Sequence, residues 1–422
     1  MLVTLVACYF AVTICIGFYA ARRVKNSADY LVAGRSLPLY MNTATVFATW
    51  FGAELILAVS STFLKEGLQG VVGDPFGAAF CLIFVALFLA APYYRLKLMT
   101  VGDFYKKRYN RTVELASAAA ISISYLGWSS ANLVALGIVI YTVSGNAITL
   151  EQGTVIVGIY TLFGGMWSVA FTDLFQTVII VAGLIYIAWM LAGMAGGVDK
   201  VVATAQASDR LKFFPGASLH DWLGFIAAFV TMALGSVAQQ DVFQRVTSAR
   251  TEKIARQGTL LGGSLYLLMA FIPMFIAVSA LLIDPAMVKQ MLSNENDFQQ
   301  VLPTLILQRT PLFAQVLFFG ALLSAILSTA SGTLLAPTAV ITENVIQPLW
   351  GHKLSDRKML VLLRLILIGF TCCVTLFALQ SESSMYQMVQ DAYKVTLVAA
   401  FTPLVFGMFW RRATPQGALL SM

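Results

Sequence analysis

The chain has 422 residues, of which 59% are hydrophobic and 11% are charged, and its formal net charge is +7. Apolar stretches of about 20 residues recur along it, and such a composition excludes a soluble globular protein. We therefore expect an all-α, polytopic membrane protein. No nucleic-acid partner is expected, because the basic residues follow the pattern of membrane topology.

Eleven membrane spans are predicted, each an apolar stretch long enough to cross a bilayer. In chain order they are residues 2–21, 38–63, 73–93, 113–144, 147–165, 169–195, 222–239, 258–282, 312–342, 360–380 and 388–410. Short loops join them, so we expect a leading helix and loop (1–37) followed by one ten-helix core (38–412). Residues 413–422 are expected to start a further helix that is missing or truncated.

The basic residues divide unequally between the two sets of loops. Alternate connections, beginning after the first span and including Arg245 in the connection 240–257, hold all but seven of the 27 Lys and Arg residues. The other seven are Lys65, Lys200, Arg210, Lys212, Lys289, Arg309 and Lys394. Since cytoplasmic loops are enriched in Lys and Arg, the N-terminus is predicted to lie outside. The sequon Asn110-Arg111-Thr112 then falls in a cytoplasmic loop, so we expect a bacterial inner membrane.

A group of hydroxyls lies inside the apolar stretch Leu312–Val340, where the chain reads A-I-L-S-T-A-S-G. Helical spacing puts Ser324, Ser328 and Ser331 on one face. Hydrocarbon offers no water, so each hydroxyl needs a partner or a cavity. An array of oxygens suits a hard cation such as Na⁺. Small residues also allow close helix packing, and the motif alone leaves both interpretations open.

Two spans are interrupted by glycine. The second span contains A-T-W-F-G-A-E around Gly52, and the seventh contains L-G-S-V-A-Q-Q-D around Gly235. Without the first span, these are helices one and six of a ten-helix set. Paired broken helices are typical of secondary transporters built from inverted repeats, with the binding site at the breaks. The repeats would cover about 38–195 and 222–412.

Three carboxylates lie in or beside the predicted spans, where an Asp at the centre costs roughly 2.5–3.5 kcal/mol. Asp173 lies about one turn into its span, where it could serve a coupling ion or cap the helix. Glu54 follows the Gly52 interruption, where it could contact a substrate, a salt-bridge partner or water. Asp74 is expected at the membrane interface, with a role in substrate binding as the alternative.

Two tryptophans, Trp50 and Trp128, are predicted deep in spans, away from the interfaces where Trp usually gathers. They could be packing residues, or they could wall a substrate pocket and hold a cation over their rings. The sequence shows no H-E-x-x-H, G-x-S-x-G, P-loop or paired-cysteine motif. We therefore expect neither an enzyme nor a cofactor, and transport would draw on an ion gradient.

Three segments resemble the sodium:solute symporter family. They are Y-T-L-F-G-G-M-W-S-V-A-F-T-D-L-F-Q (Tyr160–Gln176), Q-Q-D-V-F-Q-R (Gln239–Arg245) and the A-x-x-S-T-x-S run at Ala325–Ser331. The resemblance implies the leucine-transporter-like fold, in which ten core helices form two inverted five-helix repeats and one extra helix precedes them.

The resemblance also implies Na⁺ sites. The main site would use the backbone carbonyls of Ala48, Phe51 and Ala325 and the hydroxyls of Ser328 and Thr329. Some members hold a second Na⁺, which here would use Asp173, Ser328 and Ser331. Gly332 stands where a hydroxyl would strengthen that second site.

The expected function is Na⁺-coupled uptake of a small organic solute by alternating access, in a lipid bilayer and without a required oligomer. We expect Trp50, Glu54, Asp74 and Trp128 to contact the solute. The two tryptophans resemble those of the choline branch, although its third tryptophan aligns with about Ala238. A quaternary-amine carrier is therefore one alternative, and a solute-sensing membrane module of a signalling protein is another.

Overall fold

The computed structural model describes the whole chain except residues 146, 150–151, 153–164, 294–297, 351–353 and 382. The described backbone is helical and contains no named strand; an isolated bridge pairs Leu37 with Ala249. The fifth predicted span, 147–165, and the start of the Tyr160–Gln176 segment lie largely outside the described residues.

Nine helices in the described part of the chain are long and apolar enough to cross a membrane. Six are α1 (Leu2–Ala21), α8 (Arg111–Val143), α10 (Met166–Ala195), α14 (Glu252–Ile283), α17 (Leu312–Val340, continued by η7, Ile341–Ile346) and α18 (Asp356–Gln380). Three are built from consecutive segments: η3–α5–η4–α6 (Val72–Leu96), α12–η5 (Leu219–Ala238) and α19–η9–α20 (Met385–Phe409). With one bent pair they make ten of the eleven predicted spans.

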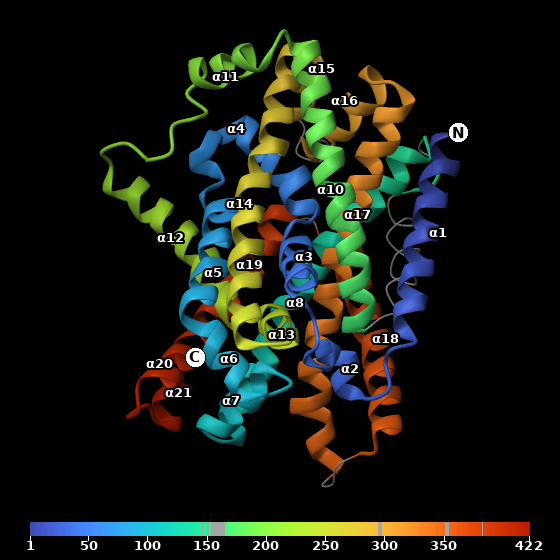
Figure 1. Cartoon of the computed structure of the whole chain (residues 1–422). Coiled ribbons are helices and arrows are strands. Elements are labelled where there is room, and N and C mark those ends of the chain that lie inside the picture. Colours follow the sequence, from blue (N-terminus) through green and yellow to red (C-terminus); the bar gives the residue numbers. More distant parts are fainter. Residues whose placement is uncertain (146, 150–151, 153–164, 294–297, 351–353, 382) are drawn as a thin grey trace.

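The spans run side by side, and shorter helices cover both ends (Figure 1). At the end that holds the N-terminus lie α11 (Val198–Ala207), α15 (Pro285–Leu292) and α16 (Val301–Arg309). At the opposite end lie α2 (Ser27–Val32), α7 (Val101–Arg108) and α21 (Pro415–Ser421). Helix α1 packs against α10 and α17 at the periphery, as a helix outside the ten-helix core should.

Both predicted interruptions are present. Helix α3 (Leu39–Trp50) ends at Phe51, whose ψ is 71°, and the chain resumes in η2 (Glu54–Val59) and α4 (Ser60–Gly70) at an angle of 52°. In the seventh span, η5 (Ser236–Ala238) leads to an extended Gln239 before α13 (Gln240–Ser248) begins. A broken helix leaves backbone groups without intrahelical partners, so both breaks expose polar backbone inside the bundle.

The connection 240–257 was expected to be a cytoplasmic loop, and the structure corrects this. Every residue of α13 is buried, and Arg245 is 1% exposed. The charged loop begins only at Arg250, which is exposed. Arg245 therefore lies inside the protein, and its charge belongs to the core and not to the membrane surface.

The helices of the core converge on the α3 break. Helix α10 packs against α3 and α17, α8 packs against α17 and α19 (Met385–Thr396), and α14 packs against α3. The α3 break approaches α17 closely, because a Cβ added to Gly52 would lie 2.6 Å from Thr329 Oγ1. Only glycine fits at this crossing without displacement.

Candidate functional site

An aromatic cluster lies beside the α3 break. The Trp50 and Trp128 rings meet edge to face with centroids 5.9 Å apart. Tyr393 of α19 contacts both rings, at 6.2 and 5.5 Å, and Tyr125 stacks on Trp128 at 6.0 Å. Trp50 and Trp128 are 7% and 3% exposed. The structure thus brings the two predicted tryptophans together in the protein interior.

A carboxylate that the sequence analysis did not single out lies against this cluster. Asp241, at the start of α13, accepts hydrogen bonds from Trp50 Nε1 (3.0 Å) and the Tyr125 hydroxyl (2.5 Å). It is fully buried. In the sequence, Asp241 closes the L-G-S-V-A-Q-Q-D segment around Gly235 and precedes Arg245 by four residues. Residues four apart share one face of a helix, so this spacing could have indicated that Asp241 and Arg245 lie together.

Three of the predicted ligands of the main Na⁺ site meet at one hydroxyl. Thr329 Oγ1 donates to the Ala325 carbonyl at 3.0 Å and approaches the Ala48 carbonyl at 3.5 Å. Thr329 is 2% exposed, and Ala48 and Ala325 are fully buried. Phe51 is also buried and lies at the break itself, but its carbonyl makes none of these contacts.

Asp173 and Ser328 also meet. Ser328 donates to Asp173 Oδ1 at 2.5 Å, and both side chains are buried. Helix α10 begins at Met166 with Gly165 as its N-cap, so the alternative role of Asp173 as a helix cap is wrong. Ser331 does not join the pair: it is half-buried, and its hydroxyl donates to the Leu327 carbonyl of its own helix at 2.7 Å.

Glu54 and Asp74 lie in the two segments that follow the α3 break, η2 and η3 (Val72–Gly77), which pack against each other. Tyr266 of α14 donates a hydrogen bond to Asp74. Asp74 is 1% exposed and lies near the start of the candidate span Val72–Leu96. Glu54 Oε1 is buried with no hydrogen-bond partner in the described chain. This pair therefore offers free acceptor capacity toward the interior.

The model of the sodium:solute symporter family matches residues 30–422. The chain belongs to this family. It is 24% identical over 417 residues to the high-affinity choline transporter 1 of Drosophila melanogaster, covering 92% of this chain and 64% of that protein. It is 25% identical over 423 residues to the high-affinity proline transporter PutP of Bacillus subtilis (strain 168), covering 96% and 87%.

Two solved structures share the fold of this symporter-family chain. A Na⁺-coupled sialic acid symporter in a substrate-bound outward-open state matches with a TM-score of 0.83 and 18% identity, over 99% of this chain and 88% of that one. A transporter of the nucleobase-cation-symport-1 family matches with a TM-score of 0.62 and 13% identity, over 92% and 86%. The leucine-transporter-like fold is confirmed.

The family assignment also confirms the predicted class of function. Members are Na⁺-coupled solute symporters that span the membrane many times, and the chain is a transporter-family protein and not an enzyme. Na⁺ and a small solute are thus the partners that the family implies.

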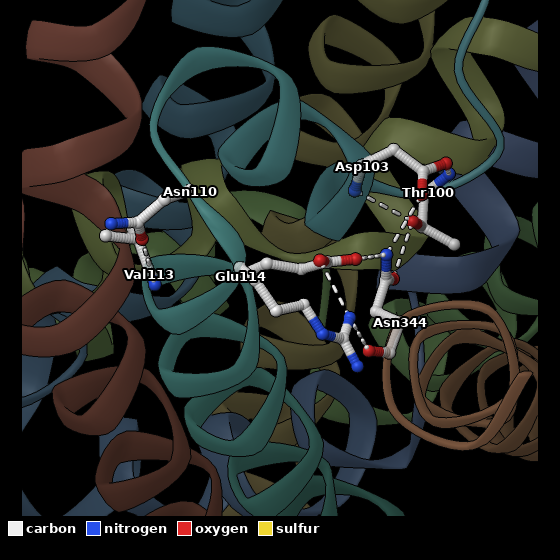
Figure 2. A network of polar contacts seen from close by, with 7 residues as sticks. Thr100, Asp103, Asn110, Val113, Glu114 and Asn344 are labelled. Carbon is white, nitrogen blue, oxygen red and sulfur yellow. Dashed lines mark hydrogen bonds and ion pairs between the residues drawn. The ribbon is translucent and has the colours of Figure 1, made fainter. Parts of the chain in front are cut away.

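A separate polar network lies at the end of the symporter opposite its N-terminus; we call it the Asn344 cluster (Figure 2). It consists of Thr100, Asp103, Arg111, Glu114 and Asn344. The Asn344 amide donates to Asp103 Oδ1 and Glu114 Oε1, both at 2.9 Å, and accepts from the Thr100 hydroxyl at 2.7 Å. Arg111 donates to the Asn344 carbonyl at 2.5 Å and pairs with Glu114 Oε2 at 2.7 Å. These contacts join α7, α8 and η7.

Proposed function

We propose that this chain couples the entry of Na⁺ to the uptake of a small organic solute by alternating access. The observation that carries the proposal is the approach of Thr329 Oγ1 to the Ala48 carbonyl across the α3 break. A carbonyl freed by a broken helix and a buried hydroxyl supply the type of oxygen ligand that a hard cation requires. We propose that Ala48, Phe51, Ala325, Ser328 and Thr329 bind this ion.

The hydrogen bond between Ser328 and Asp173 places a carboxylate one side chain away from this proposed site. A buried negative charge attracts a cation strongly where water is excluded. Na⁺ bound between α3 and α17 would stabilise one arrangement of these two helices. Because a ligand shifts a conformational equilibrium only by its differential affinity for the two states, this bridging position would couple Na⁺ to the transport cycle.

The solute is proposed to bind between the aromatic cluster and the acidic side chains. Trp50 and Trp128 supply aromatic rings, Asp241 lies against them, and Glu54 and Asp74 lie in the segments that follow the break. Aromatic faces and carboxylates together favour a positively charged nitrogen. The named solutes of two relatives, choline and proline, both carry such a nitrogen.

A quaternary-amine carrier is a narrower candidate. The deep pair of tryptophans favours it, and Ala238, at the position of the third tryptophan of the choline branch, weighs against a complete cage. Glu54 and Asp74 accept hydrogen bonds, which a quaternary amine cannot donate. A primary or secondary amine would use these acceptors as well as the rings.

We further propose that the N-terminus lies outside and that the protein resides in a bacterial inner membrane, with 1–37 preceding the transporter core 38–412. The basic residues of α7 and of the segment after α20 lie at the end opposite the N-terminus, which supports this orientation. Na⁺ is the coupling ion, and neither a further cofactor nor an oligomer is required.

A thermal-unfolding screen with and without Na⁺ identifies the solute. Purified protein is heated with choline, betaine, proline, galactose or sialic acid, and binding to the folded state raises the unfolding temperature. A charged amine should raise it more in Na⁺ than in K⁺. A galactose or sialic acid shift with no shift for any amine would contradict the proposed solute class.

Uptake into proteoliposomes then tests the ion site. Thr329→Ala and Ser328→Ala should each weaken Na⁺ activation roughly tenfold or more, because each removes a proposed ligand oxygen. Thr338→Ala is the matched control: it removes another buried hydroxyl of α17, which donates to its own helix at Leu334 (2.7 Å). Unchanged Na⁺ activation in both variants would refute the proposed site.

A further inference from the structure

Three ionisable side chains are buried on helices that pack against α17: Asp173 on α10, and Asp241 and Arg245 on α13. Asp173 and Asp241 are fully buried and Arg245 is 1% exposed. A charge buried in a protein inside a membrane is costly unless it is paired, so this group is expected to hold a fixed balance of charge.

Arg245 is held in place by both breaks. Its Nε donates to Thr49 Oγ1 at 2.9 Å, next to the α3 break. Its Nη1 donates to the Asp241 carbonyl at 3.3 Å, just after the break between η5 and α13. Its Nη2 is buried with no hydrogen-bond partner in the described residues. A guanidinium with one unused nitrogen is a cation that is positioned but incompletely paired.

The unused nitrogen lies where a side chain of residue 332 would be. A Cβ added to Gly332 would lie 2.5 Å from Arg245 Nη2. Gly332 is four residues after Ser328, so the guanidinium lies against the same face of α17 as the Ser328–Asp173 pair, one turn away. The absence of a side chain at 332 therefore makes room for the arginine.

The expected ligands of a second Na⁺ do not converge. Asp173 Oδ2 is buried with no hydrogen-bond partner in the described part of the chain, while Ser331 donates to its own helix. Asp173 meets Ser328, but Ser328 is also a proposed ligand of the main site. In place of a further hydroxyl, the Arg245 guanidinium lies beside Gly332, one turn after Ser328.

We propose that the Arg245 guanidinium is a built-in cation that takes the place of a second Na⁺, so that the protein binds one Na⁺ per transport cycle. This inference rests on the proposed function. The guanidinium takes the space beside Gly332 that a further ligand side chain would need, so the Ser328–Thr329 site is left to bind a single Na⁺. Asp173, next to that site through Ser328, is the counter-charge of the mobile ion.

Equilibrium binding of radiolabelled Na⁺ to the purified full chain tests this without knowledge of the solute. The wild type should bind one Na⁺ per protein with a non-cooperative curve. Arg245→Gln should bind two, because removal of the guanidinium leaves room and negative charge for a second ion. Asp173→Asn should weaken the single site roughly tenfold or more, since it removes the counter-charge.

Two further variants keep the test decisive. Arg245→Lys retains the charge and should keep a single Na⁺ even if Arg245→Gln fails to fold. Arg250→Gln removes an exposed arginine beyond α13 and should behave like the wild type.

Two Na⁺ bound to the wild type would overturn this inference and leave the proposed function intact, whereas no Na⁺ bound would overturn the proposed function as well. One Na⁺ at unchanged affinity in folded Arg245→Gln would also overturn the inference.

Discussion

Two largely buried polar regions differ in how completely their groups are paired: the Asn344 cluster and the central site, which comprises Asp173, Arg245, Ser328 and Thr329. In the Asn344 cluster the side-chain amide uses its oxygen and its nitrogen, and Glu114 is bound by an amide and a guanidinium. In the central site Asp173 Oδ2 and Arg245 Nη2 have no hydrogen-bond partner within the described chain.

This difference distinguishes polar groups that stabilise the fold from polar groups that are expected to bind an ion. A satisfied buried network holds elements together, whereas an unpaired buried group costs free energy that some other function must justify. The Asn344 cluster ties α7 and α8 to the end of α17, so it is expected to act on stability. The central site retains an unused carboxylate oxygen, the kind of ligand that a site which binds and releases a cation requires.

The largest expected effect is on the central site, from Gly52→Ala. The added Cβ would lie 2.6 Å from Thr329 Oγ1, and overpacking of this kind costs about 1–3 kcal/mol. Na⁺ affinity, measured by equilibrium binding, should fall roughly tenfold or more. Gly320→Ala on α17 is the control, because nothing lies within 4 Å of its added Cβ. Equal Na⁺ affinities in the two variants would show that the α3–α17 crossing is not part of the Na⁺ site.

The next effect is on the Asn344 cluster, from Asn344→Ala. The change removes one buried hydrogen bond from each of Thr100, Asp103 and Glu114, so the free energy of unfolding should fall by about 1–3 kcal/mol. The unfolding temperature without Na⁺ measures this loss. Na⁺ affinity should stay within about twofold of the wild type if the cluster is structural. A large loss of Na⁺ affinity in Asn344→Ala would show that the Asn344 cluster also contributes to ion binding.

A smaller effect concerns pH. Burial raises the pKa of Asp103 above its usual value, although Thr100, Met99 and Asn344 donate hydrogen bonds to it. The folded state therefore favours the protonated acid, and its contribution to stability is present below the unfolded pKa of about 3.9 and is lost as pH rises through the folded value. Asp103→Asn cannot titrate. Its unfolding temperature relative to the wild type should thus rise between pH 4 and pH 7; a constant difference would contradict this sign.

The smallest expected effect sharpens the boundary of the central site. Ser331→Ala removes a hydroxyl whose hydrogen bond, among the described residues, goes to the Leu327 carbonyl of its own helix. Na⁺ affinity should change by less than about twofold, in contrast to Ser328→Ala, three residues earlier. A loss as large as that of Ser328→Ala would show that Ser331 turns toward Asp173 when Na⁺ binds.

The broken helices could be predicted from the sequence because their cause is local. Glycine inside an apolar span weakens the helix, and both Gly52 and Gly235 lie at observed breaks. The positions of most spans follow equally directly from hydropathy. Contacts between distant helices, such as Ser328 with Asp173, came only from the resemblance to a family, since one sequence holds no record of which helices meet.

The errors have physical causes as well. Arg245 was counted as a loop residue because loop counting assigns any arginine beside an apolar stretch to the surface, whereas α13 continues a broken span into the interior. The Asn344 cluster was missed because a single amide in an apolar helix gives no signal in hydropathy or charge.

The guanidinium of Arg245 has a consequence for how far a solute can be concentrated. An ion tethered to the protein does not cross the membrane, so it draws no work from the gradient. For a tenfold Na⁺ gradient and a membrane potential of about 100 mV, one Na⁺ supplies about 3.7 kcal/mol, which concentrates an uncharged solute about 500-fold. A second Na⁺ would square that ratio. By carrying one of its cations as a side chain, the protein would accept the lower ratio and use half as much of the gradient for each molecule taken up.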